Sequence, residues 1–181
     1  MVRLTLEFRG FNIIGNDGEA FEFVVYKGFL LAKKEIWFAS AKTTDFIIPH
    51  PISKEPINFS QWLVILRNRG VKIKFLLAPN QENKPLYQKL KSEANIEFRF
   101  CYDMHMKLIL VDGGWLYFGS ANLTGAGLGS RKRDGRNNFE IGTITIDKQV
   151  IQNVEKLIKE IWEGEHCRNC YQKEKGYCKG I

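Results

Sequence analysis

The stretch HMKLILVDGGWLYFGSAN, residues 105–122, contains two apolar runs separated by Asp112-Gly113-Gly114. Both runs have the length and the β-branched and aromatic content of strands, and the Asp-Gly-Gly sequence is typical of a tight turn. We therefore expect a β-hairpin here, with strands at 106–111 and 115–119.

Polar side chains stand at the open end of this hairpin. Side chains alternate in direction along a strand, so His105 and Lys107 are expected on the same face. An imidazole beside an ammonium suits phosphodiester chemistry, because the ring can attack phosphorus or transfer protons while the cation balances the phosphoryl charge. The second strand returns Ser120 and Asn122 to the same edge, where they are expected to bind phosphate oxygens or to orient the ring. A His-x-Lys pair on a strand is by itself usually incidental. Six specified residues at fixed spacing on adjacent strands rarely occur by chance.

This stretch resembles the HxKxxxxD motif of the phospholipase D superfamily, with its GSxN extension, at every defining position. Residues 35–42 (EIWFASAK) and 67–77 (RNRGVKIKFLL) resemble the family's early strand and its helix–strand unit, and residues 137–140 its Asn-x-Glu element. The resemblance covers roughly residues 20–162. It implies an α/β layered sandwich, with a central mixed β-sheet flanked by helices.

The resemblance also implies roles for individual residues. His105 is the implied nucleophile and forms a phosphohistidine intermediate. Lys107, Ser120 and Asn122 are implied to contact the phosphate. Glu140 is implied to hold His105 by a hydrogen bond that fixes its tautomer and stabilises the charged ring.

Two further motif positions are expected to be structural. Gly119 follows the second strand. Asp112, at the junction of strand and turn, either braces the hairpin or contacts substrate, and both readings stay open.

A single copy of the motif supplies one histidine where the family reaction needs two. His50 and His166 lack the motif context. Single-motif members of the family pair two chains across a twofold axis, which brings identical residues together. The resemblance thus implies a homodimer with both His105 rings in one site, and chemistry that needs no metal or other cofactor.

The charge of the chain favours nucleic acid as the substrate. The formal net charge is +7, and such a surplus attracts polyanions. A basic loop follows the motif and is expected to bind the nucleic-acid backbone through Arg131, Lys132, Arg133 and Arg136. The short single-motif form resembles the nonspecific endonuclease branch of the family, acting on DNA or RNA. The alternatives are a phospholipase or phosphatidyltransferase, and a non-catalytic nucleic-acid-binding module.

Cysteines gather near the C-terminus. Cys167 and Cys170 form a Cys-x-x-Cys pair, and Cys178 is a third candidate ligand for a structural zinc ion. His166 is a strained fourth candidate, and Cys101 is a less favoured one. An iron–sulfur cluster, a disulfide or a metal-free tail are the alternatives.

Apolar periodicity predicts the remaining elements. We expect a catalytic domain over residues 1–164 and a basic, cysteine-containing tail over 165–181. No secretory signal or membrane span is recognisable, so we expect a cytoplasmic protein without stable membrane association. The expected elements are strands at 1–9, 35–40, 71–75, 96–100 and 139–146, a loop at 43–56, and helices at 19–34, 58–69, 82–92 and 147–162. The helix at 19–34 has Leu31 on its apolar face, and its stretch FEFVVY (21–26) is also compatible with a strand.

Overall fold

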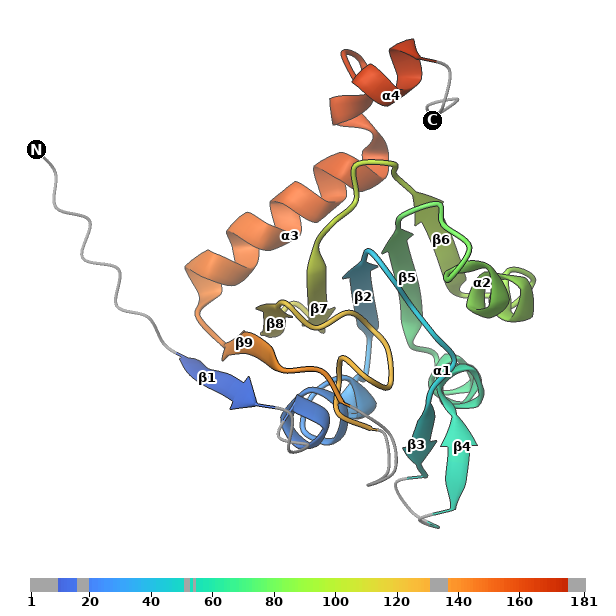
Figure 1. Cartoon of the computed structure of the whole chain (residues 1–181), viewed down its shortest axis with the longest axis vertical. Helices are drawn as coiled ribbons and strands as arrows, with labels where there is room; N and C mark the ends of the chain where they lie inside the picture. Colours follow the sequence, from blue (N-terminus) through green and yellow to red (C-terminus); the bar gives the residue numbers. More distant parts are fainter. Residues whose placement is uncertain (1–9, 16–19, 51–52, 54, 131–136, 176–181) are drawn as a thin grey trace, which may run out of the picture.

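The computed structural model describes residues 10–15, 20–50, 53, 55–130 and 137–175 (Figure 1). The expected strand at 1–9 lies outside the described residues. The described elements, in chain order, are β1 (Gly10–Gly15), η1 (Phe21–Tyr26), η2 (Phe29–Leu31), β2 (Glu35–Ser40), β3 (Ile47–Pro49), β4 (Pro56–Asn58), α1 (Phe59–Asn68), β5 (Lys72–Leu77), α2 (Lys84–Leu90), β6 (Ile96–Phe100), β7 (Lys107–Val111), β8 (Trp115–Gly119), β9 (Glu140–Thr145), α3 (Lys148–Glu163), η3 (Glu165–Cys167) and α4 (Tyr171–Glu174).

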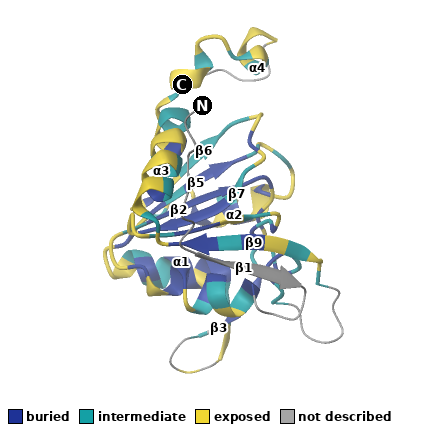
Figure 2. Ribbon diagram, turned by 90° about the vertical axis from the view of Figure 1, so that its left-hand side faces the viewer, coloured by how far each residue is buried: buried dark blue, intermediate teal, exposed yellow. Residues whose placement is uncertain are grey.

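A seven-stranded mixed sheet forms the centre of the molecule, in the order β1-β9-β8-β7-β2-β5-β6. β2, β5 and β6 are parallel to one another, and the remaining neighbours are antiparallel. α3 crosses one face of the sheet, while η1 and α1 lie on the other (Figures 1 and 2). The expected α/β sandwich with a mixed sheet flanked by helices is confirmed.

Two hydrophobic clusters hold these layers together. Alternate residues of β2 serve different clusters, so Phe38 joins the larger cluster with α1, and Trp37 joins the smaller cluster beneath α3. The rings of Trp37 and Trp162 meet edge to face at 5.2 Å between centroids, which fixes the end of α3 against the sheet. Strands buried on both faces explain why β2 and β7 are apolar almost throughout.

Capping residues set the ends of the two longest helices. The Asn58 backbone N–H donates to Gln61 Oε1 at the start of α1 (2.8 Å), and Asp147 accepts from two backbone N–H groups at the start of α3. Gly70 and Gly164 follow these helices with φ of 87° and 80°, the left-handed conformation that glycine favours. The predicted bounds of both helices are confirmed to within a residue or two.

The expected helix at 19–34 is wrong as one continuous element. The segment forms the short π-helix η1 and the 3₁₀-helix η2, separated at Gly28. A Cβ at Gly28 would stand 2.2 Å from the Val24 carbonyl oxygen and 2.6 Å from the Trp115 ring, so a side chain at this position would not fit between η1 and the hairpin. Leu31, expected on the buried face, is 62% exposed, because the turn at Gly28 rotates it outward and buries Phe29 and Leu30 instead.

The expected loop at 43–56 is also wrong in part, because β3 and β4 pair as a two-stranded hairpin within and beyond it. On α3 (Lys148–Glu163), Ile151 and Ile158 are buried, whereas Leu157 is 42% exposed. No helix within the described ranges is long and apolar enough to cross a membrane.

Candidate active site

The motif residues gather at one edge of the sheet because of strand direction. Lys107 begins β7, Ser120 follows the end of β8, and Glu140 begins β9. β8 runs antiparallel to both neighbours, so its end lies beside their beginnings. His105 is exposed and lies in the segment just before β7. The sheet therefore brings together residues that are up to 35 positions apart in the chain.

The ammonium of Lys107 lies against His105. Its Nζ is 3.3 Å from each ring nitrogen and donates a 2.8 Å hydrogen bond to the His105 carbonyl oxygen. Burial lowers the pKa of Lys107, and the nearby Glu140 carboxylate acts in the opposite direction. The predicted His–Lys pair is present, with the cation within reach of any group bonded to the ring.

Ser120 and Glu140 form a second polar group at this edge. Ser120 Oγ donates to Glu140 Oε2 and accepts from the Ile141 backbone N–H at 3.0 Å. Asn138 Nδ2 donates to Glu140 Oε1 at 3.0 Å. Among the described residues the hydrogen bonds of Glu140 thus go to Ser120 and Asn138, and the implied bond to His105 stays a prediction.

Asn122 connects the motif to the segment after β2. Its Oδ1 accepts from the Lys42 backbone N–H at 3.2 Å. One residue further, the Leu123 N–H donates to Ser40 Oγ at 3.2 Å. Sequence reasoning missed Ser40 and Lys42 as supporting residues, although both lie in the 35–42 segment that resembles the family.

Asp112 occupies the opposite end of β7 from Lys107. Its carboxylate accepts three backbone N–H groups at 2.8–2.9 Å, from Lys33, Lys34 and Glu35. These bonds join the hairpin turn to the start of β2. The geometry therefore gives Asp112 a bracing contact, one of the two readings that the sequence leaves open.

Gly119 lies in close contact with the backbone of β9. A Cβ there would be 2.5 Å from the Ile141 carbonyl oxygen and 2.6 Å from Gly142 Cα. Both are backbone atoms, so no side-chain movement relieves the contact. The motif needs glycine here to keep Ser120 beside β9.

Tyr117 lies buried beneath this edge and was not predicted from the sequence. Burial, followed by the charge of Glu140, raises the pKa of its phenol to about 12. It therefore stays neutral beside the site. An aromatic residue inside a strand gives no sequence signal that distinguishes this position from ordinary core.

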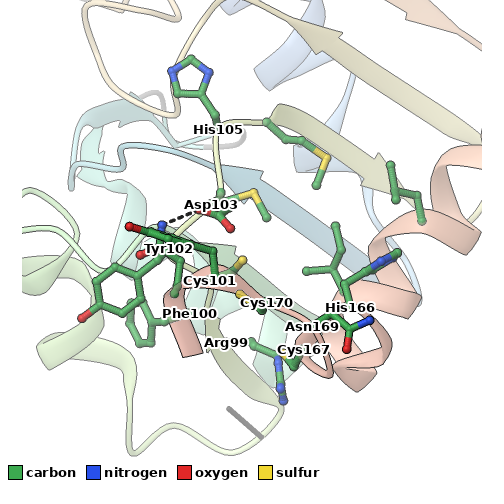
Figure 3. A pocket seen from close by; sticks show the side chains of 16 residues that line it. Arg99, Phe100, Cys101, Tyr102, Asp103, His105, His166, Cys167, Asn169 and Cys170 are labelled. Carbon is green, nitrogen blue, oxygen red and sulfur yellow. Dashed lines mark hydrogen bonds between the residues drawn. The ribbon is translucent and has the colours of Figure 1, made fainter. Parts of the chain in front are cut away.

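Some of the predicted site residues lie away from this edge of the sheet, and others lie outside the described residues. Arg131, Lys132, Arg133 and Arg136 lie outside the described residues, as does Cys178. Cys167 and Cys170 line a cavity of about 440 Å³ beside the segment that carries His105 (Figure 3).

Comparisons with known proteins agree with this architecture. A family model described as "Cardiolipin synthase, PLD-like domain" matches residues 30–162. NucT from Helicobacter pylori superposes with a TM-score of 0.65 at 16% identity, over 87% of this chain and 97% of that one. The phospholipase D family member Nuc from Salmonella typhimurium gives a TM-score of 0.62 at 18% identity, over 86% and 95%.

A larger protein shares the same fold over part of its length. The archaeal chromatin protein TrmBL2 gives a TM-score of 0.54 at 20% identity, over 86% of this chain and 52% of that one. At these identities the likenesses show the fold alone. A search of curated protein sequences found no match.

Proposed function

Because this chain belongs to the family of phospholipase D-like domains, we propose that it is a phosphodiesterase, most specifically a nuclease, with His105 as its nucleophile. The observation that carries the proposal is the Lys107 ammonium, 3.3 Å from both ring nitrogens of His105. A cation in this place stabilises the charge that develops on phosphoryl oxygens while the ring bonds to phosphorus.

The proposed reaction has two steps. A ring nitrogen of His105 attacks phosphorus, and the bond from phosphorus to the leaving oxygen breaks as that oxygen takes a proton from the partner subunit's His105. The partner subunit's His105 then removes a proton from water, and the resulting hydroxide displaces the ring and releases the phosphate monoester. One chain supplies one motif histidine, so we propose that two chains share the site across a twofold axis.

Nucleic acid is the substrate class we favour. The net charge of +7 suits a polyanion. The structural match also extends over 97% of NucT and 95% of Nuc, so the domain is similar in extent to these two proteins. The second candidate is a lipid phosphodiesterase or phosphatidyltransferase, since the matching family model carries the description of a cardiolipin synthase.

One experiment separates these functions. The purified protein is incubated in EDTA with single-stranded DNA, RNA, duplex DNA, cardiolipin and phosphatidylcholine. We expect cleavage of a nucleic acid, its loss in His105→Ala, and its retention in His166→Ala, which removes an exposed histidine outside the motif. Turnover of lipid alone would favour the second candidate. Nucleic-acid binding without cleavage would favour a binding module.

A further inference from the structure

The cavity of about 440 Å³ has His105 itself among its lining residues (Figure 3). Its volume lies within the range of about 300–1,000 Å³ that is typical of pockets for small organic ligands. One wall is the segment that links β6 to β7, and the other is the end of α3 with the C-terminal segment that follows it. The part of a substrate next to a phosphate at His105 therefore has this cavity within reach.

A polar contact joins the two walls. Gln172 Nε2 donates a 2.8 Å hydrogen bond to Asp103 Oδ1, which connects the C-terminal segment to the β6–β7 link. In the same link the Met104 N–H donates to the Cys101 carbonyl oxygen at 3.1 Å and closes a turn just before His105. The position of His105 and the shape of the cavity thus depend on the same segment.

The cavity has an apolar part. Met104, Met106, Leu157 and Ile161 line it. Leu157 is 42% exposed, so the cavity leaves open apolar surface on α3. Methionine side chains adapt to the shape of an apolar ligand. These residues favour a ligand with an apolar body.

Aromatic and polar side chains line the same cavity. Tyr102, on the β6–β7 link, is 47% exposed, and Tyr171, at the start of α4, is 59% exposed. Asn169 and Gln172 supply amide groups, and Arg99 supplies a guanidinium. A nucleobase stacks its faces on aromatic rings and hydrogen-bonds through its edges, so it suits both kinds of group. An acyl chain would hydrogen-bond with none of them.

We propose that this cavity binds an unpaired nucleobase, carried by a nucleotide next to the scissile phosphate; the proposal rests on the proposed nuclease function. The phosphate lies at His105 and Lys107, and the base stacks on Tyr102, three residues before His105 in the same segment, with Asn169 at its edge. Taking a base out of a duplex costs unstacking and unpairing energy. The cavity therefore selects single-stranded nucleic acid.

Charges around the cavity suit the same ligand. The Lys175 Nζ lies 5.6 Å from the centroid of the Tyr171 ring, and Arg99 lines the cavity itself. These cations can balance the phosphates that flank the bound nucleotide. His166 also lines the cavity, but its Nε2 lies 3.4 Å from Glu160 Oε2, and the proposed contacts do not include it.

The test follows cleavage of single-stranded oligonucleotides, DNA or RNA as the wild-type protein cleaves them, that carry one stable abasic nucleotide. Gel electrophoresis resolves the rate at each bond. With wild-type protein we expect kcat/KM to fall by about 5- to 150-fold at one of the two bonds that flank the abasic nucleotide, the loss expected for one stacked base. The intact sequence in a duplex should be cleaved at least about tenfold more slowly than as a single strand.

A substitution then links the base to Tyr102. Tyr102→Ala should lower kcat/KM on the intact strand by a similar factor, with no further loss at the bond that the abasic nucleotide already slows. A general distortion of the cavity would lower both rates equally. Tyr102→Phe keeps the ring and should restore the wild-type pattern. Leu31→Ala is the control, because it removes an exposed apolar residue before β2, at the end of that strand away from His105.

The failure of this inference is distinct from the failure of the nuclease proposal. Cleavage that the abasic nucleotide slows at no bond, equal rates on single strand and duplex, or additive losses in Tyr102→Ala would each overturn the base site and leave the nuclease proposal intact. No cleavage of any nucleic acid by the wild-type protein would overturn both. The abasic measurement needs no substitution, so it decides the question even where Tyr102→Ala fails to fold.

Discussion

The Nζ of Lys107 lies 3.3 Å from both ring nitrogens of His105 and 2.8 Å from its carbonyl oxygen. The hydrogen bond to the backbone holds the ammonium in place whichever ring nitrogen reacts. In the proposed reaction the ring bonds to phosphorus, and the phosphoryl oxygens would then come close to this cation. This proposed role leads to the first two predictions.

Removing the Lys107 charge should slow the chemical step. We expect Lys107→Ala to lower kcat by about 10²- to 10³-fold, the usual cost of losing one group that stabilises transition-state charge. Lys72→Ala, which removes an exposed lysine of β5, is the matched control and should leave kcat unchanged. A Lys107→Ala enzyme with wild-type kcat would exclude the proposed role of the ammonium.

The pH dependence should report the same ammonium. As pH rises through the pKa of Lys107 the charge is lost, so kcat/KM should fall on the alkaline side. Burial lowers this pKa and Glu140 raises it. Glu140→Gln should therefore move the alkaline fall to lower pH, whatever its effect on the maximal rate. Glu163→Gln, on the exposed end of α3, should not move it. An alkaline limb that stays in place or moves upward in Glu140→Gln would contradict this account.

Asp112 should stabilise the fold without taking part in turnover. Asp112→Asn keeps the shape but replaces one acceptor oxygen with an amide donor that faces a backbone N–H. We expect the free energy of unfolding to fall by about 2 kcal/mol, measured by urea denaturation, with kcat of the folded enzyme little changed. Full stability with a large loss of kcat would instead place Asp112 in contact with substrate.

The close approach at Gly119 gives a prediction with an internal control. Gly119→Ala places a methyl group 2.5 Å from the Ile141 carbonyl oxygen, and we expect it to cost at least about 2 kcal/mol of unfolding free energy. At Gly114 the nearest atom to an added Cβ is 4.0 Å away. Gly114→Ala should therefore change stability by less than about 0.5 kcal/mol. Thermal unfolding of both variants makes the comparison, and equal stabilities would show that β8 and β9 can separate at no cost.

Local sequence signals predicted much of the fold. The strand at 96–100 agrees with β6, and the Asp-Gly-Gly turn joins β7 to β8 as expected, with Asp112 and Gly113 at φ of 52° and 63°. These elements have either a clear alternation of apolar and polar residues or a turn sequence that is compatible with few other conformations. The meeting of the motif residues could be predicted from this hairpin. The free ends of its two strands lie together, opposite the turn.

The remaining features depend on contacts between distant segments. The stretch FEFVVY, residues 21–26, is apolar at most positions, so its period does not distinguish helix from strand. The close packing of Gly28 on Trp115 joins segments that are far apart in the sequence. The contact of Lys42 with Asn122 arises only because β2 lies beside β7. Cys101 likewise lines one cavity with Cys167 and Cys170 only in the folded chain, because β6 and the segment after α3 are far apart in the sequence.

The central claim is that two chains share one site. It is tested most directly by unfolding wild-type and His105→Ala chains together in equal amounts, refolding the mixture, and measuring activity per total protein. If each site needs His105 from both subunits, random pairing leaves about one quarter of the wild-type activity, and the activity follows the square of the wild-type fraction. Activity of about one half, in linear proportion to the wild-type fraction, would show that each chain works alone and would contradict the shared site.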